Sequence, residues 1–207
     1  IDVPLVGEIP NIAKRRHWWQ KKNDEDRKVV VSEGNKNIIN ESFRLLRTKL
    51  TYFIGAEKNK KVIMLTSFNP SSGKSFITAN LGTTYAISGK RVLLIDCDVR
   101  HFSLSTMIEK RKEGLSTFLS GMDNNLESLI VKDAFYAGCD VLPVGIVPPN
   151  PTELLQSDRF KLMMDIVREQ YDLIILDCPP IEIVADAGIV KDHADATIFV
   201  VRAGLMD

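Results

Sequence analysis

The chain has 207 residues, enough for one α/β domain with a substantial hydrophobic core. Its 27 basic and 27 acidic side chains balance, which argues against a protein that binds nucleic acid through bulk positive charge. The three cysteines are widely spaced and odd in number, so they predict neither a metal cluster nor a disulfide framework and fit a reducing cytosol.

Residues 1–28 are predicted to be a linker ahead of a folded domain at residues 29–207. Two prolines and a glycine favour an extended chain over residues 1–11. Residues 14–22 form a basic cluster with both tryptophans, which suits either a segment beside an anionic membrane or a solvated linker with one hydrophobic anchor. Because the chain begins at Ile1 and stops soon after an apolar strand, we expect it to be a piece of a longer protein.

Alternating strands and helices are predicted over the rest of the chain. Strands, most of them near-continuous in Val, Leu and Ile as buried parallel strands are, are expected at residues 29–31, 61–67, 91–96, 139–143, 172–177 and 196–201. Helices are expected at residues 38–54, 73–88, 114–119, 126–130, from 151 through 160–169, and at 186–190. This alternation predicts an α/β fold: a doubly wound, mostly parallel sheet with helices on both faces.

The helix start near residue 151 carries three matching signals. Asn150 suits the N-cap, and Pro151 suits the first helical position, where no backbone N–H is needed. Glu153 places negative charge at the positive end of the helix dipole. These residues predict a capped helix start after an irregular loop.

The chain is organised around a strand, a small-residue loop ending Gly73-Lys74-Ser75, and a helix. Backbone N–H groups of such a loop face phosphates, and Lys74 can reach the β- and γ-oxygens. The hydroxyl of Ser75 can ligate Mg²⁺. Although Phe68 stands where the full G-x-x-x-x-G-K-[ST] pattern has its first glycine, the loop indicates a P-loop NTPase fold. The predicted nucleotide-binding residues are Ser71, Ser72, Gly73, Lys74, Ser75 and Phe76.

Three carboxylates are predicted to lie beside this loop. Asp96 and Asp98 end the next apolar strand one strand period apart, so their side chains are expected to point the same way. Like-directed carboxylates at the carboxyl end of a sheet repel unless a cation lies between them, and Mg²⁺ is the natural one. Asp177 ends a further strand before two prolines and matches a carboxylate that holds Mg²⁺ in phosphate-loop enzymes. Arg100 could neutralise a carboxylate or a phosphate, or have a structural role.

These motifs together resemble the cytoplasmic kinase domain of the bacterial tyrosine kinases that regulate capsular and exopolysaccharide export, of the polysaccharide co-polymerase type. That family has a modified phosphate loop, a motif of apolar residues with Asp-x-Asp-x-Arg, and another with Asp-x-Pro-Pro. The matching segments are residues 67–75, 93–100 and 174–180. The resemblance runs from about Pro4 to Gly204.

The resemblance also covers a Glu-x-x-Arg-x-x-Arg helix, matched by Glu41, Arg44 and Arg47. On spacing alone, these residues indicate the solvent face of an amphipathic helix with i,i+3 pairs. In the family this helix mediates a ring-like homo-oligomer in which each active site meets a neighbour's tyrosine-rich tail. The resemblance therefore implies a subunit interface.

The resemblance implies a role for each residue of the phosphate site. Lys74 and its loop would hold the phosphates of ATP or ADP, while Ser75, Asp98 and Asp177 would hold Mg²⁺ directly or through water. Asp96 would orient and deprotonate the acceptor tyrosine hydroxyl, since phosphoryl transfer needs positioning and charge neutralisation more than covalent chemistry. Lys74, Asp96 and Asp98 are thus the predicted catalytic residues of an ATP-dependent protein-tyrosine autokinase.

A cellular setting is implied as well. The basic tryptophan-containing segment would lie just inside the membrane, after a transmembrane adaptor or polysaccharide co-polymerase region on the same or a separate chain. The fragment itself would be soluble, at the cytoplasmic face of the bacterial inner membrane, and would not bind nucleic acid. A cognate phosphotyrosine phosphatase would be a further partner.

Two departures from the family pattern matter. The family's loop usually reads Pro-Gly-Glu-Gly-Lys-Ser, whereas this chain has serine at Ser71. If that position needs a positive φ, serine costs about 1 kcal/mol more than glycine, and ATP affinity falls below the family norm. The second departure is the tyrosine cluster: the four tyrosines are scattered over the domain, so we expect poor autophosphorylation and acceptor tyrosines outside this chain.

Two other functions fit parts of the pattern. A partition- or septum-placement-type ATPase shares the fold and the acidic strands, but that class has a lysine early in the loop, where this chain has Asn69. An ATP-gated assembly switch for a polysaccharide polymerase, with little phosphotransfer, would use the same nucleotide-binding residues. The sequence leaves the second alternative open.

Overall fold

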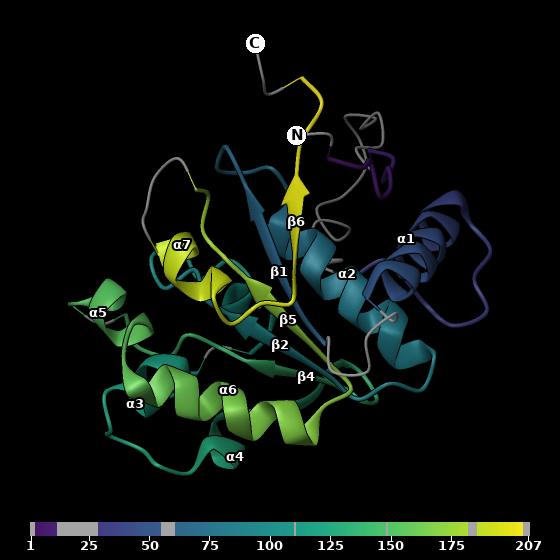
Figure 1. The fold of residues 1–207 in the computed structure, drawn as a ribbon. Helices are drawn as coiled ribbons and strands as arrows, with labels where there is room; N and C mark the ends of the chain where they lie inside the picture. Colours follow the sequence, from purple (N-terminus) through teal and green to yellow (C-terminus); the bar gives the residue numbers. More distant parts are fainter. Residues whose placement is uncertain are drawn as a thin grey trace, which may run out of the picture.

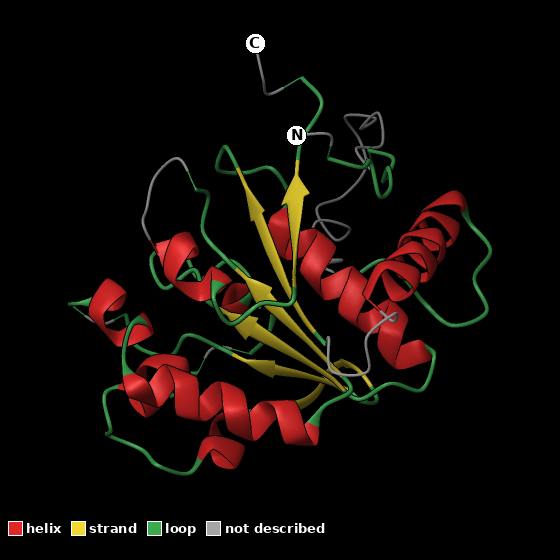
Figure 2. Cartoon of the chain, viewed as in Figure 1, coloured by secondary structure: helices red, strands yellow, loops and turns green. Residues whose placement is uncertain are grey.

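A six-stranded sheet forms the centre of the protein, and helices cover both of its faces (Figure 1, Figure 2). The computed structural model describes residues 3–11, 29–54, 61–109, 111–147, 149–181 and 186–204. The strands lie in the order β3-β4-β2-β5-β1-β6, with bounds β1 (Val62–Ser67), β2 (Val92–Asp96), β3 (Val131–Tyr136), β4 (Cys139–Leu142), β5 (Leu173–Asp177) and β6 (Ala196–Val200). β3 is antiparallel to β4, and the other neighbouring pairs are parallel. The predicted doubly wound, mostly parallel α/β fold is confirmed.

Two helices, α1 (Ile38–Ile54) and α2 (Lys74–Ile87), pack on one face of the sheet, at the right of Figure 1. The other face is covered by α3 (Leu115–Leu119), α4 (Leu126–Leu129), α5 (Pro151–Leu155), α6 (Asp158–Gln170) and α7 (Asp186–Lys191). A 3-10 turn, η2 (Ser105–Met107), follows β2. The predicted helices are present with ends that differ by one or a few residues, except that the helix expected from 151 through 160–169 is two helices, α5 and α6. The extended backbone of Ser157, the N-cap of α6, separates them.

The central strands are buried on both faces because their residues alternate between two hydrophobic cores. In β2, Leu93 and Ile95 belong to the core under α3 to α7, whereas Leu94 belongs to the core under α1 and α2. All residues of β2 and β5 are buried, which explains their apolar runs without polar alternation. Because β5 pairs in parallel with both β1 and β2, the carboxyl ends of these three strands meet at one edge of the sheet, where ligands bind in such folds.

Residues 29–31 do not form the predicted strand. The backbone N–H groups of Val30 and Val31 donate instead to the side-chain oxygen of Asn80 in α2, at 2.8 and 3.2 Å. Because an amide side chain accepts these N–H groups in place of a neighbouring strand, the segment is held without extending the sheet.

Strand β3 was not predicted. Lys132 and Asp133 interrupt its apolar pattern, and Asp133 has a φ of 51°, so the pairing with β4 is irregular. At the start of α5, Pro151 occupies the predicted first position, but the side chain of Asn150 makes no capping bond. Its amide donates to the carboxylate of Glu153 at 2.8 Å, so this side chain bridges the first turn instead of accepting a backbone N–H.

Residues 3–11 form no helix, in agreement with the predicted extended chain, and Val6 and Ile9 pack against the core under α1 and α2. The basic segment at residues 14–22 lies outside the described residues. In the part of the chain that the structure describes, no helix is long and apolar enough to cross a bilayer.

Candidate nucleotide-binding site

The phosphate loop connects the end of β1 to the start of α2. Gly73 occupies the N-cap of α2 with φ 92° and ψ 16°, a left-handed conformation that glycine adopts without steric cost. Helical bonding starts with the N–H of Ile77 donating to the Gly73 carbonyl at 3.0 Å. The N–H groups of the turn before Ile77 are therefore available to an anion, as at other helix N-termini.

Two serine hydroxyls brace the loop from within. Ser67 Oγ and Ser72 Oγ both donate to the carbonyl oxygen of Asn69, at 2.8 and 2.7 Å. Between Asn69 and Gly73, Ser71 is exposed and has a φ of 59°. Ser71 therefore has the positive φ on which the predicted cost of a serine at this position depends.

Replacing Ser71 with glycine is expected to raise the free energy of unfolding by about 1 kcal/mol, because glycine adopts this conformation without the serine's steric cost. Urea denaturation of the unliganded chain measures the change. Ser120→Gly is the matched control: Ser120 is also exposed but has a φ of −75°, so its replacement should give no gain. A lower stability for Ser71→Gly than for the unchanged chain would show that the loop holds no relievable strain.

Lys74 is the first residue of α2 and is 7% exposed. Its ammonium donates to Ser67 Oγ at 3.2 Å, which turns the charge back toward the carboxyl end of β1. Ser75 follows it in the first turn and is half-buried. The side chain of Phe76 packs on Phe43 of α1, with ring centroids 6.1 Å apart, so this residue can offer a ligand its backbone N–H rather than its ring.

The three predicted carboxylates are buried together beside Lys74. Asp96 and Asp177 are paired in register at the carboxyl ends of β2 and β5. Asp98 lies two residues beyond the end of β2, so strand alternation alone does not set its direction. Asp96, Asp98 and Asp177 are 0%, 6% and 1% exposed.

Asp177 has one carboxylate oxygen in use and one without a protein partner. Thr78 of α2 donates to its Oδ1 at 3.3 Å, while its buried Oδ2 has no hydrogen-bond partner. Burial raises the pKa of Asp177 to about 6, whereas Ser75 and Lys74 lower it and Asp98 raises it. An unsatisfied buried carboxylate oxygen next to a loop hydroxyl fits a cation ligand.

Asp96 is held by contacts from the segment that follows it. Its Oδ2 accepts the backbone N–H and the hydroxyl of Ser105, at 2.8 and 2.6 Å, and its Oδ1 accepts the N–H of Asp98 at 3.1 Å. Burial and the charge of Asp177 raise the pKa of Asp96 well above its usual range, against the lowering effect of Ser105. The carboxylate is therefore fixed in position and has a strong affinity for a proton or a cation.

The predicted residues could hold Mg²⁺ only together with oxygen atoms of a bound nucleotide and water. Among the described residues, no group of three or more His, Cys, Asp or Glu side chains could hold a metal ion by itself. Ser75, Asp98 and Asp177 supply hard oxygen atoms, and Mg²⁺ commonly completes its octahedron with phosphate oxygens and water. The donor set thus suits Mg²⁺ bound together with a nucleotide.

The structure adds three contacts that the sequence did not reveal. Ser105, besides its bonds to Asp96, accepts the N–H of Val144 at 2.9 Å and so ties the acidic loop to the segment after β4. His101 Nδ1 lies 3.3 Å from Asp98 Oδ1. Arg202, beyond β6, donates to the carbonyl of Ser71 at 3.0 Å. The contacts of Ser105 and Arg202 join distant segments, and that of His101 lies within one loop; all three depend on loop conformation, which residue spacing does not encode. Arg100 is exposed.

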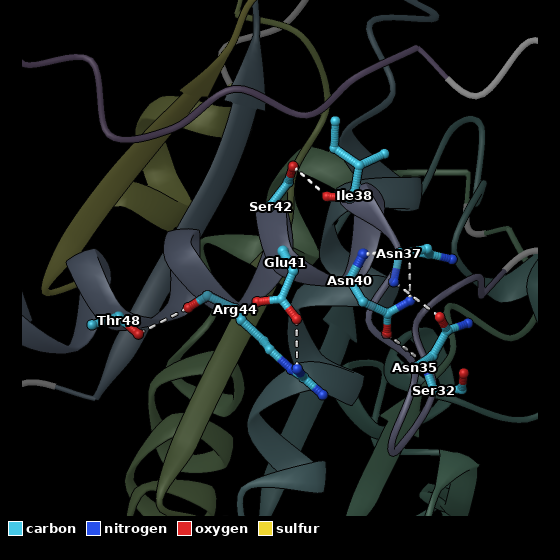
Figure 3. A network of polar contacts seen from close by, with 9 residues as sticks. All are labelled: Ser32, Asn35, Asn37, Ile38, Asn40, Glu41, Ser42, Arg44 and Thr48. Carbon is cyan, nitrogen blue, oxygen red and sulfur yellow. Dashed lines mark hydrogen bonds and ion pairs between the residues drawn. The ribbon is translucent and has the colours of Figure 1, made fainter.

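The residues predicted to form a subunit interface lie on α1. Arg44 Nη1 donates to Glu41 at 2.7 Å on the exposed part of the helix (Figure 3). Arg47, one turn further on, donates from Nη1 to the carbonyl of Thr84 in α2 at 2.9 Å. Glu41 and Arg44 are thus paired near the surface, and Arg47 connects α1 to the helix that leaves the phosphate loop.

Comparison with known proteins agrees with this geometry. A family model described as an AAA domain matches residues 60–203. The tyrosine-protein kinase wzc of Salmonella typhimurium is 37% identical in an alignment of 196 residues, which covers 89% of this chain and 27% of that protein. The chain therefore spans little more than a quarter of the length of this curated relative.

Solved structures are also similar to this chain. The kinase domain of the Escherichia coli tyrosine kinase ETK is 32% identical, with a TM-score of 0.86 over 99% of this chain and 80% of that one. The septum site-determining protein MinD of Pyrococcus horikoshii, solved with Mg-ADP, shares the fold: it is 23% identical, with a TM-score of 0.58 over 69% of this chain and 58% of that one. The chain belongs to the AAA-domain family and, within it, to the kinase domains of the bacterial tyrosine-protein kinases.

Proposed function

We propose that this chain is the catalytic domain of an ATP-dependent protein-tyrosine autokinase that regulates capsular or exopolysaccharide synthesis and export. The observation that carries the proposal is the placement of Lys74, at the first turn of α2, beside the buried carboxylates at the ends of β2 and β5. Membership of the kinase-domain family supports the choice of tyrosine as acceptor. Transfer of phosphate from Mg·ATP to a tyrosine-rich tail tests it.

Each residue of the site has a proposed task. The N–H groups of residues 71–76 and the ammonium of Lys74 bind the phosphates of ATP, and later those of ADP. Ser75, Asp98 and Asp177 hold Mg²⁺, which when bound neutralises charge on the phosphate oxygens. Asp96 orients the tyrosine hydroxyl and accepts its proton, a role suited to a buried carboxylate with a raised pKa.

The acceptor tyrosines are proposed to belong to the C-terminal tail of a neighbouring subunit. Within the domain, Tyr85 and Tyr171 are buried, and the hydroxyl of Tyr171 donates to Asp140 at 2.7 Å. Such a hydroxyl does not reach a phosphate at the other end of the sheet without unfolding. Burial therefore argues against these two tyrosines as acceptors, but Tyr52 is exposed. The proposal of an external tail in a ring-like homo-oligomer rests on the resemblance to the tyrosine-kinase family.

Replacing Glu41, Arg44 and Arg47 together with alanine is expected to dissociate the oligomer without loss of ATP binding. Glu41 and Arg44 lie at the surface of α1, while the phosphate loop lies at the other end of α2 from Thr84. Light scattering at matched concentration measures the mass. Arg47→Ala alone, which removes the bond to Thr84, should reduce stability by about 1 kcal/mol. An unchanged mass for the triple variant would exclude this interface.

The proposed cellular setting rests on the resemblance to the tyrosine-kinase family. The domain acts at the cytoplasmic face of the inner membrane, beside a transmembrane polysaccharide co-polymerase region on the same chain or a separate one. A cognate phosphotyrosine phosphatase removes the transferred phosphate by hydrolysis. The charge balance of the chain, 27 basic against 27 acidic side chains, gives no support to a nucleic-acid partner.

A further inference from the structure

Arg202 joins the far edge of the sheet to the phosphate loop. It lies two residues beyond β6, and its Nη1 donates to the carbonyl oxygen of Ser71 at 3.0 Å across 131 residues of sequence. The end of β6 is in parallel register with the end of β1, where Val200 pairs with Ser67. The segment that leads from β6 to Arg202 and the phosphate loop after β1 therefore begin side by side.

A second contact joins β6, the strand before Arg202, to the start of the phosphate loop. The ring of Phe199, in β6, packs on the ring of Phe68, with centroids 4.8 Å apart. Phe68 is the first residue of the loop, so β6 is attached to the loop at its beginning by this aromatic pair and near its middle by Arg202. Arg202 therefore extends from a strand end that is itself packed against the start of the loop.

The residue that Arg202 holds is the strained one. Ser71 has a φ of 59°, a conformation that costs a serine more than it costs glycine. Ser67 and Ser72 hold the carbonyl of Asn69 on the preceding side, and Gly73 needs no support at its own positive φ. The bond from Arg202 acts on the carbonyl of Ser71 itself, where a change of ψ would turn the next N–H away from a phosphate.

We propose that Arg202 is a positioning residue for the phosphate loop: it holds Ser71 in the left-handed conformation that nucleotide binding requires. The proposal rests on the proposed nucleotide-binding function. If the loop has the binding conformation in only a fraction of the molecules, the apparent affinity for the nucleotide is reduced by that fraction. Removing Arg202 should therefore weaken binding strongly while Ser71 is present, and weakly once glycine makes the same conformation easy.

The test is a double-mutant cycle with Mg·ADP as the probe, using Arg202→Gln, Ser71→Gly and the double variant of the whole chain. Isothermal titration calorimetry gives each Kd. Arg202→Gln is expected to raise Kd about fivefold or more in the Ser71 chain, and less than about twofold in the Ser71→Gly background. Arg111→Gln is the matched control, since Arg111 is also exposed and donates to a backbone carbonyl, that of Ser128 in α4, at 3.3 Å.

Equal losses of affinity in the two backgrounds would overturn the proposal, because Arg202 would then act only as a nearby positive charge. No loss in the Ser71 chain would overturn it as well. If the unchanged, folded chain bound no Mg·ADP, the proposed function would fail first, and this inference with it. Thermal unfolding of the unliganded variants, measured alongside, identifies any loss of affinity that comes from loss of the fold.

Discussion

Replacing Lys74 with methionine is expected to abolish tyrosine phosphorylation and to weaken Mg·ATP binding by about 100-fold or more. Removal of one preorganised charged or polar donor from a phosphate or oxyanion site commonly has an effect of this size. Lys74 is buried at the start of α2, and its ammonium is held by Ser67 Oγ at 3.2 Å, so it is already placed before ligand arrives. Methionine has a similar length and should fill the same space without the charge.

Binding of a fluorescent ATP analogue and the rate of phosphotyrosine formation measure the two losses. Lys90→Met is the matched control, because Lys90 is an exposed lysine in the turn before β2. It should change neither quantity by more than about twofold. Full activity in Lys74→Met would show that the loop does not bind phosphates in the manner proposed.

Replacing Asp177 with asparagine is expected to abolish the dependence of ATP binding on Mg²⁺ and, at the same time, to stabilise the unliganded protein. The carboxylate is buried, its Oδ2 has no protein partner, and the charges of Asp96 and Asp98 lie close to it. Without a cation this arrangement disfavours the folded state, so a neutral side chain removes an unfavourable charge. At pH 8 in a chelator, the gain should be about 3 kcal/mol.

The same residue predicts how stability depends on pH. The pKa of Asp177 in the folded protein is about 6, above its ordinary value of 3.8 in an unfolded chain, so the folded state binds the proton more tightly. In a chelator, the stability of the unchanged chain should therefore rise as the pH falls from 8 through 6 toward 4. Asp177→Asn should show a flatter profile in thermal unfolding. Parallel profiles for the two proteins would show that Asp177 is not destabilising when metal-free.

The sheet could be predicted from sequence because its central strands carry their own signal. Segments such as Val92–Asp96 and Leu173–Asp177 are buried on both faces and so are apolar throughout. Residues 29–31 look equally apolar, but their N–H groups bond to Asn80, and a side-chain acceptor cannot be recognised from residue type. β3 is a strand that the sequence did not reveal, because an edge strand that contains Lys132 and Asp133 lacks the apolar pattern.

The site was predictable where chemistry and sequence position coincide. Lys74, Asp96 and Asp177 are each fixed by a strand or helix end, so their proximity follows from the parallel order of the sheet. The partners of these residues were not predictable. Ser105 reaches Asp96 through a 3-10 turn, and Arg202 reaches Ser71 from another strand. Such contacts depend on loop conformation, which has no repeating sequence pattern.

The most direct test of the proposed function offers the chain a tyrosine-rich tail, either fused to its C-terminus or supplied as a separate peptide, together with Mg·ATP. Mass spectrometry then locates any phosphate. We expect phosphate on tyrosines of the tail, dependent on Mg²⁺ and lost in Lys74→Met. ATP binding of normal affinity with no phosphotyrosine on any tail offered would contradict a kinase and would favour an ATP-gated assembly switch.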